Sequence, residues 1–536
     1  MQGRLYYILI IVFASLLFIP FLGQVHLFDW DEINFAECAR EMIVSKDYLR
    51  MQIDYRPFWE KPPLFIWMQV LSMKAFGINE FAARLPNAIT GVFTLVTIFY
   101  AGKRMVNEKM GLWWVLLYAS TWLPHFYFKS GIIDPIFNLF IFLAFLQVCL
   151  ISHGTKPKLH ALLAGFFLGL AVMTKGPVAI LVALLSFLTF VVINKGIKGY
   201  SLFNILILAT AALLTTSIWF GIEVANHGWW FVNEFITYQI RLLQTEDAGH
   251  GGPFIYHFIV LLIGCFPAAP FLFQYGRKRT DFDDNREFTN LMWVLFWVVL
   301  ILFSIVKTKI VHYSSLCYFP LTYLAALQLY RISEKGILIK PVVKVILLTT
   351  GTIIAIAIAS LPLIGINKNK LIPLIDDPFA VGNLQAAVHW SYTECIWGGV
   401  YLLGIWFILF GFNRAVQKRL ITLCILQLLI IEVTVIHFTP KIEAFSQRAA
   451  IEYFENLKEK DVYVHVLGYK SYAHLFYAGT LPQQNPNRMN EEWLLSGNID
   501  KPAYFICKVM DADKYRALPL LEETGSKNGF VFFKRK

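Results

Sequence analysis

Apolar stretches of roughly twenty residues recur along most of the chain, from its start to about residue 437. An α-helix needs about 20 mainly apolar residues to cross the hydrocarbon core of a bilayer, so each stretch predicts a membrane-spanning helix. Only Thr174–Pro177 divide the long apolar segment 159–193 into two stretches. About thirteen spans are expected on this criterion, at 5–23, 81–101, 110–128, 132–151, 159–174, 176–193, 202–222, 253–274, 289–306, 313–330, 341–363, 395–412 and 419–437.

Lysines and arginines gather in every second loop between these stretches, which is the pattern of cytoplasmic loops in membrane proteins. This distribution predicts a cytoplasmic N-terminus, and the odd number of spans then predicts an extracytoplasmic C-terminus. The basic loops lie at 103–109, 156–158, 195–198, 277–286, 331–340 and 414–419.

Three segments outside the predicted spans are long, at about 24–80, 223–252 and 440–536, and all three fall on the extracytoplasmic side of this topology. The sequence therefore predicts an α-helical polytopic membrane domain over residues 1–439. It also predicts a small extracytoplasmic α/β domain over residues 440–536, because hydropathy falls there and the pattern changes.

Short periodic stretches lie within two of these segments. In the tail, alternation predicts strands at Val462–Leu467 and Phe530–Phe533, a third candidate strand at Ala503–Lys508, and a helix at Ser471–Ala478. In the first loop, the apolar spacing over Asn34–Met42 predicts a short amphipathic helix that lies on the membrane surface.

Composition supports the membrane assignment. Hydrophobic residues make up 57% of the chain and charged residues 15%, with a mean hydropathy of +0.56, whereas soluble domains carry about 25% charged residues. The net charge of +11 lies in short loops, so we expect contacts with anionic membrane lipids and no nucleic-acid partner. The seven cysteines show no CxxC or Cys/His spacing, so neither a disulfide framework nor a zinc site is predicted.

Carboxylates next to predicted spans are the first candidates for chemistry. Asp31 and Glu32 follow the first span, where a carboxylate could act as a general base toward an acceptor hydroxyl, or simply face water at the interface. Asp134 lies in the short turn GIIDPIF on the same side of the membrane. Because Pro135 marks a helix start, Asp134 could equally serve only as an N-cap.

Cations on the same side could hold an anionic phosphate leaving group, on which negative charge develops as a glycosidic bond breaks. The candidates are Lys61, Arg241, Lys307 and Lys309. Each lysine alone could instead contact lipid headgroups.

A metal site is a further candidate on this side. His250 could join Glu60 as a ligand of a divalent metal ion, although a lone histidine more often only forms hydrogen bonds.

Five motifs in this order are similar to those of the bacterial aminoarabinose transferases that modify lipid A, which share the GT-C membrane fold with the protein O-mannosyltransferases. DEINFAECAREM resembles their D-E-x-x-Y-A-E-x-A-R-E-M pattern, and FWEKPPLFIW resembles their F-E-K-P-P segment. The motifs lie at Asp31–Met42, at Phe58–Trp67, at Gly165–Gly176 (GFFLGLAVMTKG), at Gln239–His250 with Gly264–Pro267, and at Lys307–Tyr313 (KTKIVHY).

The resemblance implies a glycosyltransferase of a bacterial inner membrane. Asp31 would be the catalytic carboxylate with Glu32 beside it, and Asp134 would be a second acidic residue of the site. Lys61 and Arg241 would hold the carrier phosphate. The residue Glu60 would take part in a divalent metal site.

The donor implied is a sugar on a polyprenyl monophosphate, transferred with inversion to a lipid A-like glycolipid, a glycan or a protein. Two positions depart from the family. Asn34 stands where the family often has arginine, and Ile236–Tyr238 lack the histidine that often precedes the arginine of the Q-R-F motif. Lys307 or Lys309 could supply the missing cation.

The alternative is a non-catalytic membrane protein, either a lipid or sugar flippase or a transporter. Transporters often show internal repeats with broken helices in matching halves. No convincing repeat is present in the sequence, and the long segments on one side favour chemistry at the membrane surface.

Overall fold

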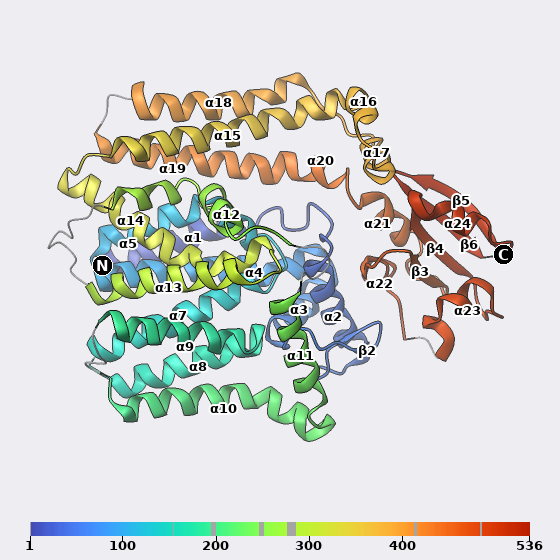
Figure 1. The fold of residues 1–536 in the computed structure, drawn as a ribbon, viewed down its shortest axis with the longest axis horizontal. Helices are drawn as coiled ribbons and strands as arrows, with labels where there is room; N and C mark the ends of the chain where they lie inside the picture. Colours follow the sequence, from blue (N-terminus) through green and yellow to red (C-terminus); the bar gives the residue numbers. More distant parts are fainter. Residues whose placement is uncertain are drawn as a thin grey trace.

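The computed structural model places long helices side by side in a bundle, with a small mixed α/β region at one end (Figure 1). The N-terminus lies at the opposite end of the bundle from this region. The residues that it describes are 2–153, 155–194, 200–245, 251–275, 286–411, 415–482 and 485–535.

Each of the thirteen predicted apolar stretches contains helix. Among the described residues, eight helices are long and apolar enough to cross a membrane, and three apolar helices are shorter. The bundle comprises α1 (Gln2–Phe18), α4 (Glu80–Met105), α5 (Glu108–Ala119), α6 (Trp122–Phe128), α7 (Asp134–His153), α8 (Pro157–Lys175), α9 (Val178–Ile193), α10 (Leu202–His227), α12 (Tyr256–Gly264), α13 (Arg286–Ile305), α14 (Tyr318–Lys335), α15 (Pro341–Ile366), α18 (Ile396–Trp406) and α19 (Val416–Val433).

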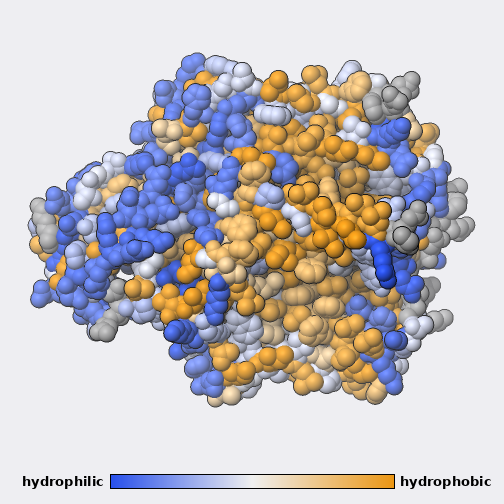
Figure 2. Space-filling view, turned by 180° about the vertical axis from the view of Figure 1, so that it is seen from behind, coloured by the Kyte–Doolittle hydropathy of each residue, from blue (hydrophilic) through white to orange (hydrophobic). Residues whose placement is uncertain are grey.

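The surface of the bundle is apolar, as expected for helices that face lipid. From the side opposite to that of Figure 1, apolar residues cover the middle of the bundle and polar residues cover the C-terminal region (Figure 2). Large side chains such as Leu188, Val192, Leu213 and Ile356 are more than half exposed. The fold class predicted from sequence is therefore confirmed, whereas the domain boundary at residues 439/440 stays a prediction.

Glycines allow the helices to approach closely where lipid gives no hydrophobic drive for association. A Cβ on Gly165 would lie 2.2 Å from the carbonyl oxygen of Leu208 in α10, and one on Gly169 would lie 2.5 Å from Cβ of Thr215. The GxxxG spacing on α8 therefore sets the close approach of α8 to α10.

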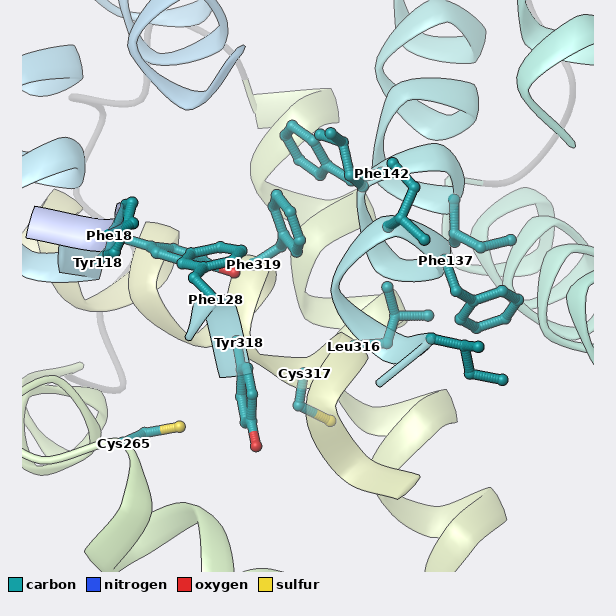
Figure 3. Packing of buried hydrophobic residues seen from close by; sticks show 14 of the residues in the cluster. Phe18, Tyr118, Phe128, Phe137, Phe142, Cys265, Leu316, Cys317, Tyr318 and Phe319 are labelled. Atoms are coloured by element: carbon teal, nitrogen blue, oxygen red, sulfur yellow. The ribbon is translucent and has the colours of Figure 1, made fainter. Parts of the chain in front are cut away.

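Aromatic side chains of α5, α7 and α14 pack together in the core of the bundle (Figure 3). The rings of Phe142 and Phe319 stack at 4.5 Å, and Tyr118 lies 5.3 Å from Phe319. The short helix η3 (Val311–Cys317) leads directly into α14, so this core fixes the segment that precedes it.

The first long loop forms α2 (Asp31–Ser45), the hairpin β1 (Gln52–Ile53) and β2 (Arg56–Pro57), and α3 (Leu64–Phe76). Helix α2 exists as predicted, but its placement on a membrane surface was wrong. All of its residues from Glu32 to Met42 are buried. Arg40 donates to the carbonyl of Thr480 at 2.9 Å, because the C-terminal region covers this helix.

The C-terminal region contains a four-stranded sheet of order β3-β4-β6-β5. Strands β3 and β4 are parallel, and β6 is antiparallel to both β4 and β5. Three strands and α22 lie where the sequence predicted them, and β5 was missed. The elements are α21 (Arg448–Glu455), β3 (Tyr463–Leu467), α22 (Ala473–Ala478), α23 (Glu491–Ser496), β4 (Ala503–Lys508), α24 (Ala512–Arg516), β5 (Leu521–Lys527) and β6 (Phe530–Arg535).

Shorter helices connect these parts. Helix α11 lies across the end of the bundle, near α2 and α3 (Figure 1). The connecting helices are α11 (Trp230–Gln244), α16 (Lys368–Leu371), α17 (Pro378–Leu384) and α20 (Thr439–Glu443).

Candidate functional site

Two carboxylates from distant parts of the chain meet at one histidine. Asp31 begins α2 and Asp134 begins α7, where the helix dipole favours a negative charge. Nε2 of His312 lies 3.5 Å from Oδ2 of Asp31 and 3.8 Å from Oδ2 of Asp134. The side chain of Asp31 is 31% exposed and that of Asp134 is 2% exposed. Asp31 is therefore the carboxylate that a substrate can reach.

Lys175, the last residue of α8, neutralises the buried carboxylate. Its Nζ lies 2.6 Å from Oδ1 of Asp134. The ammonium also lies 5.5 Å from the ring centre of Phe137 and 5.4 Å from that of Tyr313. Asp134 therefore does more than cap the start of α7, because its carboxylate also pairs with Lys175 and lies beside His312.

Gly176 positions α11 above this pair. Its φ of +81° favours glycine, and a Cβ there would lie 2.2 Å from the ring of Phe235 in α11. The glycine therefore gives the space in which Phe235 is buried, and this contact holds α11 against the end of α8.

A second pair of cations lies on one tyrosine of α11. Nζ of Lys61 lies 5.3 Å from the ring centre of Tyr238, and the guanidinium of Arg241 lies 5.1 Å from it. The hydroxyl of Tyr238 donates to Oε2 of Glu60 at 3.3 Å. The structure thus brings together three residues that the sequence singled out separately.

The cations of Lys61 and Lys175 and the carboxylates of Asp31 and Asp134 form one electrostatic group. Burial lowers the pKa of Lys61, and the negative charges of Glu60, Asp31 and Asp134 oppose that shift. The four predicted residues Asp31, Asp134, Lys61 and Arg241 are therefore linked by contacts or by direct electrostatic interaction.

Glu32 does not join this group as a second free carboxylate. Arg84 donates to both of its oxygens, at 2.9 and 2.8 Å, and the amide of Phe28 donates at 2.8 Å. Burial raises the pKa of Glu32, but the charge of Arg84 and the hydrogen bonds from Arg84 and from the amides of Phe28 and Gly131 together lower it more, so that the net pKa is lowered. Because Arg84 also binds the carbonyls of Leu22 and Val25, Glu32 fixes the start of α2 beside Asp31.

The other two predicted cations are placed differently. Lys309 is buried, and its ammonium donates to the carbonyls of Phe303, Ser304 and Val306 at the end of α13. Its positive charge thus stabilises the C-terminal end of that helix. Lys307 is exposed on the same loop.

The predicted metal site has no support in the described part of the chain. No group of three or more His, Cys, Asp or Glu side chains could hold a metal ion there. Glu60 is bonded to Tyr238, and His250 lies outside the described residues.

Sequence reasoning quoted His312 within KTKIVHY but gave it no role. Its signal was weak, since one histidine in a loop has no partner in the sequence. Asn34 has a structural role that was also missed. With its amide nitrogen toward the carbonyl of Trp30 (3.0 Å) and its oxygen toward the indole Nε1 (2.9 Å), it holds Trp30, which precedes Asp31.

Comparisons with known proteins relate parts of the chain to membrane-bound sugar transferases. Residues 60–220 match the family described as dolichyl-phosphate-mannose-protein mannosyltransferase. The undecaprenyl phosphate-alpha-4-amino-4-deoxy-L-arabinose arabinosyl transferases of Pectobacterium carotovorum and Pectobacterium atrosepticum are each 26% identical over 325 residues, or 60% of this chain. The chain spans about 58% of the length of these relatives.

Solved structures share the fold over nearly the whole chain. ArnT from Cupriavidus metallidurans bound to undecaprenyl phosphate has a TM-score of 0.78 at 17% identity, covering 99% of this chain and 98% of the other. The apo form of that protein has a TM-score of 0.76 at 17% identity, covering 100% of this chain and 98% of the other. Together with the apolar helices, these matches identify a multi-pass membrane protein with the GT-C fold.

Proposed function

We propose that the chain belongs to the GT-C family of ArnT and the protein O-mannosyltransferases, and that it is a glycosyltransferase of a bacterial inner membrane. The donor is a sugar on a polyprenyl phosphate, and the acceptor is a lipid A-like glycolipid, a glycan or a protein. One observation carries the proposal above the others. The accessible carboxylate of Asp31 shares an electrostatic group with the half-buried cation of Lys61.

Asp31 acts on the acceptor. Its carboxylate is exposed enough to meet a substrate, and Glu32 and Arg84 fix the helix start on which it lies. An acceptor oxygen held there attacks the anomeric carbon of the sugar from the face opposite to the phosphate. The bond from that carbon to the phosphate oxygen breaks, and the phosphate leaves with the electron pair, so the configuration inverts.

Lys61 and Arg241 hold the phosphate of the donor. Negative charge grows on the leaving oxygen, and cations placed there in advance stabilise it more in the transition state than in the ground state. A contact of this kind at about 4 Å contributes ~4 kcal/mol at an effective dielectric near 20. Tyr238 fixes both cations, because each lies over its ring.

Asp134 and Lys175 form a largely buried ion pair next to His312. Asp134 offers a buried negative charge to His312, and Lys175 compensates that charge. Lys307 is left as a second phosphate contact at the exposed edge, whereas Lys309 is engaged with α13. No group of three or more His, Cys, Asp or Glu side chains among the described residues could hold a metal ion, and the steps above use only the side chains of this site.

The orientation of the protein follows from its basic loops. We infer that the N-terminus is cytoplasmic and that residues 440–536 form an extracytoplasmic domain beside the site. The inference is supported by the lysine and arginine bias and by the positions of the two chain ends at opposite ends of the bundle (Figure 1).

The rival function is a flippase, which moves a lipid without making or breaking a bond. Mass spectrometry of lipid A, glycolipids and envelope proteins, with and without the gene, separates the two. We expect one glycosylated product to vanish on deletion and to return with the wild-type gene but not with Asp31→Asn. Identical products in all four strains would overturn the proposal.

A further inference from the structure

His312 lies where a proton could be received from Asp31. Its Nε2 faces Oδ2 of both Asp31 and Asp134, at 3.5 and 3.8 Å. Oδ2 of Asp134 is buried and makes no hydrogen bond within the described part of the chain. Nε2 of His312 therefore faces a carboxylate oxygen that has no other hydrogen-bond partner there.

The ring of His312 is held in place on its other sides. Tyr127 from α6 contacts it edge-on with ring centres 6.5 Å apart, and Tyr313 does so at 5.4 Å. The residues that follow, from Ser314 to Cys317, are all buried. The imidazole is therefore fixed between the two carboxylates by packing.

We propose that His312 is the final proton acceptor of the transfer, and that the acceptor substrate is therefore a hydroxyl group and not a phosphate. The inference rests on the proposed function and specifies its substrate class. A phosphate acceptor is already ionised at neutral pH and needs no base. A hydroxyl must lose a proton as it attacks, so it needs a base within hydrogen-bond reach or one relay away.

The proton and electron balance is complete with residues of this site. The acceptor oxygen forms a bond to the anomeric carbon while its proton passes to the carboxylate of Asp31. The polyprenyl phosphate leaves with the electron pair of the broken bond. Asp31 then passes the proton to Nε2 of His312, and the resulting imidazolium lies between two carboxylates until water removes the proton.

Charge on the acceptor side favours a neutral substrate. Burial raises the pKa of Asp29 and the negative charge of Asp31 raises it further, and the same charge of Asp31 opposes an anionic acceptor. Asn34 is neutral and is bonded to Trp30. One cation argues the other way, because Nζ of Lys470 lies 4.5 Å from the ring of Trp30 and could bind a phosphate.

Several groups face His312 and shape the pH response of the site. Asp31 faces it from α2, Asp134 from α7 and Tyr127 from α6. His257 on α12 interacts with it electrostatically. Tyr313 is its neighbour in the chain.

The linkage of the product tests the acceptor class without identifying the acceptor. A polyprenyl-phosphate donor with a labelled sugar, aminoarabinose or mannose, is incubated with the enzyme and with membrane vesicles from a strain lacking the gene. The unused donor is removed, and the product is treated with mild acid, which cleaves glycosyl phosphates but leaves glycosides. We expect the label to stay attached. Release of the label would overturn the proposal.

Variants test the role of the imidazole with the same assay. His312→Gln keeps a polar side chain of similar size and should lower kcat about 100-fold, within the usual range for acid–base catalysis, with the donor KM unchanged. The pH–rate profile should also change shape. His389→Gln, at an exposed histidine, should match the wild-type enzyme.

Three results would contradict the inference, and they are distinguishable. If His312→Gln keeps the wild-type kcat and pH profile, His312 is not the proton acceptor. If Lys470→Ala raises the acceptor KM and the label is acid-labile, the acceptor is a phosphate. If the wild-type enzyme transfers no label at all, the proposed function itself fails.

Discussion

Lys175 and Asp134 form a short ion pair, with Nζ 2.6 Å from Oδ1, that ties the C-terminal end of α8 to the N-terminal end of α7. Both side chains are largely buried, at 13% and 2% exposure. Each residue was visible in the sequence, one in a TKG motif and one before a proline. The positive charge of Lys175 stabilises the buried carboxylate of Asp134, which lies next to His312.

Removing Lys175 alone should therefore lower the stability of the protein more than removing both Lys175 and Asp134. Lys175→Ala leaves the carboxylate of Asp134 buried without its partner, which costs about 3–5 kcal/mol of stability. The double variant Lys175→Ala with Asp134→Ala should recover most of that loss. Thermal unfolding in detergent measures both. Equal losses in the single and double variants would show that the pair is not coupled.

Lys61→Ala should weaken use of the donor, because the carrier phosphate loses a cation. We expect the donor KM to rise at least tenfold, equivalent to about 1.4 kcal/mol, with thermal stability unchanged within error. Lys370→Ala is the matched control, since Lys370 is an exposed lysine of α16 to which the site assigns no role, and its donor KM should change less than threefold. If the two variants behave alike, Lys61 does not bind the phosphate.

The ion pair of Glu32 should make the stability of the folded protein depend on pH. The folded-state pKa of Glu32 lies below its ordinary value of 4.5, so the stabilisation from its ion pair with Arg84 is complete above that pH. It is lost as the pH falls through the lowered pKa. Glu32→Gln should lower stability at pH 7 by about 3 kcal/mol and flatten this acidic part of the profile. Parallel unfolding curves for both proteins from pH 7 to pH 3 would argue against this role.

The close contact of α8 with α10 predicts a sharp difference between two glycines. Gly165→Ala places a Cβ against the backbone of α10 and should lower the melting temperature and the yield of monodisperse protein. Gly399→Ala meets nothing within 4 Å in α18 and should be neutral or slightly stabilising, because alanine favours helix. Size-exclusion chromatography and thermal scans compare the two.

The helical part of the fold was predictable because backbone polar groups in lipid must be satisfied within each span, which makes an apolar stretch helical. The interruptions were not predictable. Within 110–128, α5 ends because Ser120 and Thr121 both donate to the carbonyl of Leu117. Side chains of this kind compete with the helix backbone only where the packing permits it.

The candidate site was partly predictable. Asp31, Asp134, Lys61 and Arg241 were chosen on charge and on their side of the membrane, and they do gather. Their partners Lys175, His312 and Tyr238 come from other segments, so only the tertiary structure joins them.

Other predictions failed for the same kind of reason. Lys309 looks like a free cation in sequence, but the turn after α13 brings its ammonium to three carbonyls. The burial of α2 depends on residues about 440 positions later, such as Thr480. The local sequence pattern does not indicate contacts between residues so far apart in the chain.

The central claim is that the protein breaks the bond between sugar and polyprenyl phosphate. Purified protein in liposomes, with a donor labelled on both sugar and lipid and with acceptor vesicles from a strain lacking the gene, tests it most directly. We predict that the sugar label leaves the lipid, that free polyprenyl phosphate appears in equal amount, and that Asp31→Asn lowers this rate at least 100-fold. Movement of intact donor across the bilayer with no free polyprenyl phosphate would contradict the account.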